Sequence, residues 1–129
     1  MKIFLSVLLL LGLGYIGTSY AKDPLQKKNF SESETNHEKI ITVKYRGNIN
    51  VNNGYFQELN LRPSSFIKSM HYDKNNNYLL VRLKNTYYHY CSIPQSVVSD
   101  WRSSSSLGRY YNYNIKGNYD CRVYPVPNY

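Results

Sequence analysis

The sequence predicts a small α+β domain in which an antiparallel meander of about three to five β-strands is packed by one α-helix and closed by one disulfide. Runs of alternating apolar and polar residues recur between short polar turns, which is typical of strands. One apolar stripe with helical spacing follows Pro94. The chain has 129 residues and 2 cysteines, which suits a single small core and one bridge.

Four strand-like runs precede the predicted helix, each bounded by polar turn residues. The first covers residues 40–45, where the odd-numbered side chains are apolar, and a turn is predicted at residues 46–48. Asn-Asn-Gly at residues 52–54 indicates another turn. Polar residues 73–77 are predicted as a hairpin loop, because Asn readily adopts a left-handed backbone. The remaining strand-like runs follow Pro63 and cover residues 65–72, 78–83 and 86–92.

The last two runs are predicted to form a hairpin with a defined register. Lys84 and Asn85 alone separate them, and a two-residue turn would place Leu83 opposite Thr86. Directly opposed residues share a face of the sheet. A longer loop would shift the register by one residue and exchange the faces. The two-residue turn gives an apolar face of Leu79, Val81, Leu83, Tyr88 and Tyr90, and an outer face of Tyr78, Leu80, Arg82, Tyr87, His89 and Cys91.

One helix is predicted to begin at Pro94, a residue suited to the first helical turn. The serines at residues 103–106 are poor helix formers, so the last turn is expected to fray. Gly108 is predicted to end the helix. Trp101 is expected to close the core between helix and sheet. The apolar stripe consists of Val97, Val98, Trp101 and Leu107.

Residues 1–21 are predicted to be a secretory signal peptide. A basic residue precedes the apolar run at residues 3–16, and the small residues Ser19 and Ala21 suit a cleavage site. The alternative is an uncleaved membrane anchor, but about 14 apolar residues fall short of the ~20 that span a bilayer. Cleavage near Ala21 would place the mature protein in the periplasm or outside the cell.

Export affects how the two cysteines are interpreted. In an oxidising compartment an even number of cysteines favours a bridge, so Cys91 and Cys121 are predicted to form a disulfide. The alternative is two buried free thiols. Residues 119–124 are predicted as a short edge strand, which Pro125 and Pro127 would end.

Positive charge is concentrated in the predicted domain. Residues 22–39 hold four basic and four acidic residues and few large apolar groups, which predicts a flexible polar tail. Residues 40–129 carry eleven Lys and Arg against four Asp and Glu, a net charge of +7. They also hold the 13 tyrosines that remain once Tyr15 and Tyr20 leave with the signal peptide.

The order and spacing of these residues resemble the KTSC domain, a short module named for the C-terminal extension of some lysyl-tRNA synthetases and also found alone in small bacterial proteins. The resemblance implies a strand meander followed by a helix. Two positions depart from the family pattern, because His71 and Asn85 stand where the family often has Gly. The matching residues are Ser65, Ile67, Met70, Tyr72, Asp73, Leu79, Val81, Leu83, Tyr88, His89, Tyr90, Pro94, Ser106, Gly108, Tyr110, Tyr111, Asn112, Ile115 and Tyr119.

The resemblance completes the predicted organisation of the chain. The signal peptide and the polar tail are followed by an N-terminal strand with its connecting segment at residues 40–63. A KTSC-like domain is predicted at residues 64–124, and a short C-terminal tail at residues 125–129.

The composition favours a binding module. Tyr and Arg are common anchors of recognition surfaces, and the positive charge suits an acidic protein or an anionic envelope component. One alternative is nucleic-acid binding, which the synthetase context of the family implies. Another is that the charge only maintains solubility and attracts anionic surfaces. The candidate contact residues are Arg82, Tyr87, His89, Arg109, Tyr110 and Lys116.

An enzyme is not predicted. A metal-independent, nuclease-like site could use His71 and His89 with Lys116, one imidazole taking a proton while the other gives one. No recognised spacing supports such a site, and the aspartates form neither a carboxylate pair nor a metal-ligand pattern. We therefore predict no catalytic residue, no metal and no cofactor. A monomer without a stable membrane span after signal cleavage is expected.

Overall fold

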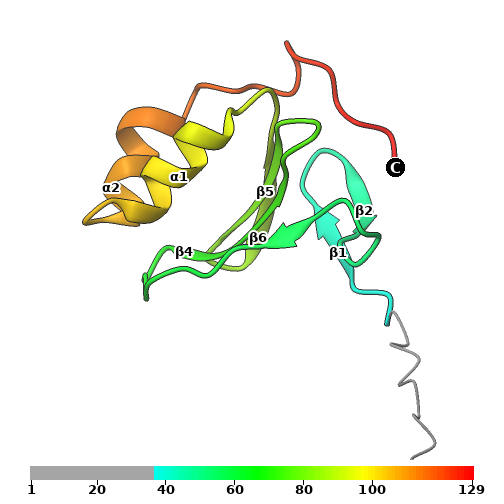
Figure 1. Ribbon diagram of the computed structural model, residues 1–129, viewed down its shortest axis with the longest axis horizontal. Coiled ribbons are helices and arrows are strands. Elements are labelled where there is room, and N and C mark those ends of the chain that lie inside the picture. Colours follow the sequence, from blue (N-terminus) through cyan, green and yellow to red (C-terminus); the bar gives the residue numbers. More distant parts are fainter. Residues whose placement is uncertain (1–36) are drawn as a thin grey trace, which may run out of the picture. The chain divides into compact units, whose positions relative to one another are not determined.

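The computed structural model describes residues 37–129 (Figure 1). The predicted signal peptide and residues 22–36 of the predicted tail lie outside this range. The described strands are β1 (Ile40–Val43), β2 (Gly47–Asn50), β3 (Gln57–Glu58), β4 (Ile67–Asp73), β5 (Tyr78–Leu83) and β6 (Thr86–Tyr90). They are followed by helices α1 (Gln95–Ser103) and α2 (Leu107–Tyr110) and the π-helical segment η2 (Tyr111–Ile115).

Within residues 37–129 the strands form one six-stranded sheet with the order β2-β1-β6-β5-β4-β3. Every neighbouring pair is antiparallel except β1 and β6, which run parallel and pair at Val43 and Tyr87. The predicted α+β class is confirmed. The sheet is larger than the predicted meander, and it is mixed.

The hairpin of β5 and β6 has the predicted register. Leu83 pairs with Thr86, and each residue farther from the turn pairs as expected, as far as Leu79 with Tyr90. The left-handed residue of the turn is Lys84, with φ +52°. In the preceding hairpin Asn77 has φ +49°, as the Asn-rich loop predicts.

Both faces of the sheet are packed, which the sequence does not predict. Figure 1 shows α1 and α2 on one side of β4, β5 and β6 and the β1–β2 hairpin on the other. The sheet curls, since Lys39 beside β1 forms a 3.0 Å ion pair with Glu58 of β3, although three strands lie between β1 and β3. The helix-side core includes Met70, Tyr72, Leu79, Val81, Val98, Trp101 and Ile115. The core inside the curl contains Ile41, Val43, Ile49, Val51, Tyr78, Leu80 and Cys91.

The predicted outer face of the β5–β6 hairpin is therefore largely covered. Tyr78, Leu80 and Cys91 are fully buried there, because β1 and β2 supply a second apolar layer. The alternation of the N-terminal strand required such a partner. Its own apolar side chains, such as Ile41 and Val43, have nowhere else to be buried.

The predicted single helix is two helices. Ser104 has an extended backbone and ends α1, and the Ser106 hydroxyl accepts a hydrogen bond from the Arg109 amide to begin α2. Leu107 therefore does not extend the first helix, and Gly108 lies inside the second instead of ending the first. Serine caps favour such breaks, since their hydroxyls compete for backbone groups. The expected role of Trp101 is confirmed by its complete burial in the helix-side core.

Two further local predictions are wrong. The first turn is at residues 44–46, and Gly47 and Asn48 belong to β2, because Tyr45 with φ +67° reverses the chain one residue early. Residues 119–124 are not a strand, because β6 already pairs with β5 and β1 on its two sides. The Cys91 amide donates to the Tyr119 carbonyl at 2.8 Å, and the chain then turns at Asp120.

The predicted disulfide between Cys91 and Cys121 is present, with a Cα–Cα distance of 5.0 Å. Cys91 follows β6 and Cys121 lies in the segment after the helices. The bridge therefore fixes that segment beside β6.

Candidate binding groove

The structure separates the predicted contact residues into two groups. Arg82, Tyr87 and His89 lie half-buried on the curled face of the sheet, where the Tyr87 hydroxyl is 3.1 Å from Ser69 Oγ. Arg109 and Lys116 are exposed on the helical segment. Tyr110 lies between these two in sequence and stacks on Trp101, with ring centroids 6.2 Å apart. Packing thus accounts for much of Tyr87 and Tyr110, whereas His89, Arg109 and Lys116 have exposed surface.

A groove of about 520 Å³ lies at one end of β6, and His89 is the predicted contact residue that lines it. One wall comes from β6, another from the turn after β1, and the third from residues 117–122. We call this the β6 groove. Its lining residues are Tyr45, Tyr88, His89, Tyr90, Gly117, Asn118, Asp120, Cys121 and Arg122.

The walls of the β6 groove are held by covalent and backbone constraints. The disulfide at Cys121 and the bond from the Cys91 amide to the Tyr119 carbonyl hold the wall of residues 117–122 against β6. Gly117, with φ +81°, lets the chain turn into this wall after η2. On the opposite side Tyr45 is 84% exposed, so its ring projects from the turn.

Lys44 gives the tyrosine side of the groove a positive charge. Its Nζ lies 5.0 Å from the ring centroid of Tyr45 and 5.4 Å from that of Tyr88. The hydrogen bond with Tyr45 raises the pKa of Lys44, with a smaller contribution from Tyr88. The ammonium group is therefore firmly charged and lies between two aromatic faces.

The opposite wall carries a closed ion pair. Arg122 Nη2 lies 2.6 Å from Asp120 Oδ2, and Arg122 Nε donates to both carboxylate oxygens. These bonds lower the pKa of Asp120 to about 2. The carboxylate therefore stays ionised and is paired with its neighbour. The Arg122 side chain remains 90% exposed and can turn to a ligand.

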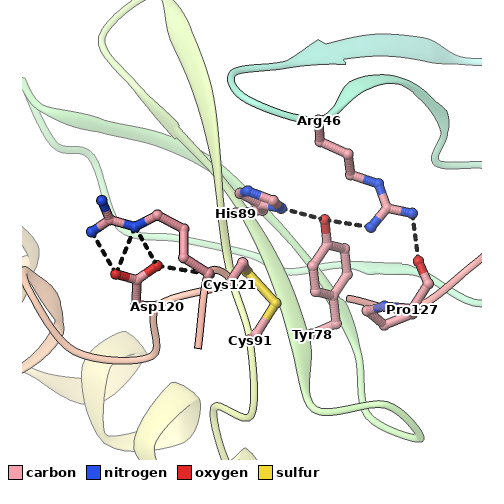
Figure 2. Close-up of a disulfide and its surroundings, with 8 residues drawn as sticks. Arg46, Tyr78, His89, Cys91, Asp120, Cys121 and Pro127 are labelled. Atoms are coloured by element: carbon pink, nitrogen blue, oxygen red, sulfur yellow. Dashed lines mark hydrogen bonds and ion pairs between the residues drawn. A yellow bond between two sulfur atoms is a disulfide. The ribbon is translucent and has the colours of Figure 1, made fainter. Parts of the chain in front are cut away.

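His89 is oriented by a chain of hydrogen bonds across the sheet (Figure 2). Arg46 Nη1 donates to the Tyr78 hydroxyl at 3.1 Å, and that hydroxyl lies 3.0 Å from His89 Nδ1. Burial raises the pKa of Tyr78 to about 12, so the phenol keeps its proton. Since the phenol oxygen accepts from Arg46, its proton is donated to Nδ1, which places the imidazole hydrogen on Nε2.

Burial lowers the pKa of His89, and the charge of Arg46 lowers it further, while Asp120 opposes both. The imidazole is therefore neutral at pH 7. It offers the groove a weak polar edge, and the unpaired positive charge beside the groove comes from Lys44.

The histidines of the hypothetical nuclease-like site are not adjacent. His71 on β4 and His89 on β6 both pair with Leu80 of β5, so they lie two strands apart on one face, a spacing of about 10 Å. His71 is 2% exposed, and its Nε2 has no hydrogen-bond partner. Lys116 follows η2, whose Ile115 packs in the helix-side core, the layer opposite these histidines.

Two features are absent from residues 37–129. No three His, Cys, Asp or Glu side chains lie close enough together to hold a metal ion. No helix in this range has the length and apolar character needed to cross a membrane.

Comparison with known proteins identifies the family. Residues 63–119 match the KTSC domain family model, so this part of the chain is a KTSC domain, which confirms the resemblance. The chain is also similar to a crystal structure of a KTSC domain protein from Yersinia pestis, at 29% identity and a TM-score of 0.47. That similarity covers 50% of this chain and 92% of the other. No curated protein matches the chain.

The groove combines the KTSC domain with segments outside it. Tyr88, His89 and Tyr90 lie inside the matched residues, whereas Tyr45 and Arg122 lie outside them. Lys44 and Tyr45 are not among the residues predicted as contacts, and Arg122 was predicted only as one of the basic residues that would contact nucleic acid in the alternative function. The predicted disulfide was the signal that could have placed Arg122 near β6, since it is adjacent to Cys121.

Proposed function

We propose that this chain is an exported, non-catalytic binding module of the KTSC type, and that it recognises an acidic protein or an anionic envelope component through the β6 groove. The main support for this proposal is the position of Lys44 between the rings of Tyr45 and Tyr88. Export is supported by the sequence of residues 1–21, and the disulfide suits an oxidising compartment.

The chemistry of the groove supports an anionic ligand. Lys44 lies beside the lining residues Tyr45 and Tyr88, and Arg122 belongs to the wall of residues 117–122. The one carboxylate among the lining residues, Asp120, is already paired. An acidic side chain entering the groove would meet the charge of Lys44, and it could also accept a hydrogen bond from Arg122 Nη1, which makes none of the bonds to Asp120. The tyrosine rings add apolar contact area at low conformational cost, which is typical of recognition surfaces.

The placement of the histidines supports a non-catalytic role. General acid–base catalysis requires groups within hydrogen-bond reach of the reacting atoms. His71 is buried and His89 lies two strands away with its Nδ1 occupied by Tyr78. The two imidazoles would not reach one substrate bond.

The test measures binding of the full mature chain to three anionic probes. These are an oligoglutamate peptide, vesicles with anionic phospholipid, and a single-stranded RNA oligonucleotide. We expect the peptide or the vesicles to bind, and the Lys44→Glu/Arg122→Glu variant to bind them at least about tenfold more weakly, since it reverses both groove cations. Equal binding by wild type and variant would contradict the proposed groove.

The control is Arg109→Glu/Lys116→Glu, which changes the net charge by the same amount on the helical segment. If both double variants lose affinity equally, only the net charge matters. Preferential binding of RNA, lost in the groove variant, would favour nucleic-acid recognition, for which the projecting ring of Tyr45 offers a stacking surface.

A further inference from the structure

Residues 125–129 lie along the curled side of the sheet without joining it as a strand. Figure 1 shows this segment passing from the helical side of the molecule toward the β1–β2 hairpin. The segment is fixed at two points. Arg46 Nη2 donates to the Pro127 carbonyl at 2.6 Å (Figure 2), and Tyr129 inserts beside the sheet. Attachment by one carbonyl and one aromatic anchor is typical of a bound extended peptide.

Tyr129 occupies an aromatic box. Its ring centroid lies 5.0 Å from that of Phe56 and 5.2 Å from that of Tyr55, and the Arg46 guanidinium lies 5.3 Å away. Its hydroxyl donates to Asp73 Oδ2 at 2.7 Å. We define the tyrosine box as Arg46, Tyr55, Phe56, Asp73 and Tyr78.

The polar groups of the box are held independently of Tyr129. Asp73 is fully buried, and its carboxylate also accepts hydrogen bonds from the Asn75 and Asn76 amides and from Asn76 Nδ2. Burial opposes ionisation of Asp73, but these bonds and the one from Tyr129 together lower its pKa. Arg46 is likewise anchored to Tyr78. The acceptor site is thus largely pre-organised.

The occupant is attached at the surface. Tyr129 is 39% exposed, and residues 124–126 before its carbonyl anchor are exposed as well. Release of the segment would therefore uncover the box, while Arg46 and Asp73 would keep their other hydrogen bonds.

We propose that the tyrosine box is a binding site for an extended, tyrosine-bearing peptide of another protein chain, and that residues 125–129 fill it in cis. The phenol hydroxyl is recognised by Asp73, and the carbonyl two residues earlier by Arg46. The site is distinct from the β6 groove and its occupant is selected by an aromatic group and not by negative charge, so this proposal goes beyond the proposed function.

The chemistry of the box predicts its selectivity. A phenylalanine in place of tyrosine would leave Asp73 without its donor, and a hydrogen bond to a charged acceptor is worth at least about tenfold in affinity. A phosphotyrosine would bring two further negative charges beside a buried carboxylate and should be rejected. Unmodified tyrosine is therefore the preferred side chain.

The test uses the full chain with Tyr129→Ala and, as the probe, a labelled peptide with the sequence of residues 123–129. We expect the peptide to bind this variant at least about tenfold more tightly than wild type, because the tethered segment competes at a high effective concentration. A peptide with alanine at the position of Tyr129 should not bind. Equal affinity for wild type and variant, or for both peptides, would overturn the proposal.

Two further variants keep the result interpretable. Tyr124→Ala removes an exposed tyrosine from the same part of the chain and should leave peptide binding at the wild-type level. Tyr129→Phe keeps the ring in the box, so it serves if the alanine variant does not fold. The tyrosine peptide should displace this weakened cis ligand more readily than wild-type Tyr129, and failure to do so would overturn the role of Asp73. Neither result depends on the β6 groove.

Discussion

His71 is an unusual residue in the core inside the curl. It lies on β4 opposite Glu58, packs near the ring of Tyr87, and leaves its Nε2 buried without a partner. Burial lowers the pKa of His71; the charge of Glu58 opposes this shift and that of Lys39 adds to it. The imidazole is thus kept neutral in the folded protein.

This placement predicts that stability falls in mild acid. The folded-state pKa lies below the ordinary 6.5, so the unfolded chain binds the proton more readily and stability decreases as the pH falls below about 6.5. We expect His71→Leu to lose less stability than wild type between about pH 7.5 and about pH 5.5 in urea unfolding. Part of the dependence should remain, because burial also lowers the pKa of His89.

The control is Met70→Leu, which changes a buried residue next to His71 without removing a titratable group. It should keep the wild-type pH dependence. If His71→Leu loses as much stability in acid as wild type does, protonation of His71 does not contribute to unfolding.

At the scale of elements, Trp101 joins the two helices that the serines separate. Its ring is fully buried, and its Nε1 donates to the Leu107 carbonyl at 2.9 Å. We expect Trp101→Phe to lower the free energy of unfolding by about 2 kcal/mol, since the smaller ring leaves a cavity and an unpaired carbonyl. Urea unfolding measures the change. The control Tyr113→Phe, at an exposed position, should stay within about 0.5 kcal/mol of wild type, and an equal loss would contradict this role.

The disulfide is the element that fixes the wall of the β6 groove. It closes a loop with a sequence separation of 30, which corresponds to about 3–4 kcal/mol on the chain-entropy model. We expect Cys91→Ala/Cys121→Ala to lose about that much stability in urea. Amide exchange at residues 117–122 should also accelerate. Reductant should reproduce both changes in wild type and add nothing in the variant; a variant with unchanged exchange would show that packing alone holds the wall.

Elements with local determinants were predictable, and those that depend on distant partners were not. The β5–β6 register follows from its two-residue turn, and the strand of β5 was predicted with its observed bounds. The parallel pairing of β1 with β6 joins residues far apart in sequence. The alternation of apolar and polar residues along one strand does not indicate which distant strand will pair with it. The strand predicted at residues 119–124 is wrong for the same reason, since β1 occupies the edge it would need.

The candidate site was predictable only in part. His89 was selected from the alternation of β6, and it does line the groove. Lys44 and Tyr45 were placed inside a strand, because the early reversal at Tyr45 requires a positive φ that its residue type does not indicate. The tyrosine box was not predicted, since it joins Asp73 to a tyrosine 56 residues later.

At the scale of the whole molecule, the segments outside residues 63–119 complete the KTSC domain on one side. The β1–β2 hairpin and residues 120–129 cover the curled face of the sheet, and they contribute Lys44, Tyr45 and Arg122 to the groove. Any ligand binding by the groove would therefore depend on the segments of this chain that lie outside residues 63–119. The matched domain alone lacks the wall formed by the turn after β1, and it lacks the part of the third wall formed by residues 120–122.

The net charge and the groove should act on different steps of binding. A net charge of +7 on residues 40–129 attracts an anionic partner over long range, which raises the association rate and is screened by salt. Contacts within the groove act after encounter and set the dissociation rate.

For an acidic peptide that binds wild type, we expect Arg109→Glu/Lys116→Glu mainly to slow association, with an effect that disappears at high salt. Lys44→Glu/Arg122→Glu should also accelerate dissociation, and this effect should persist in salt. Surface plasmon resonance at two salt concentrations separates the rates; if both variants change only association, the groove makes no specific contact and the charge alone accounts for binding.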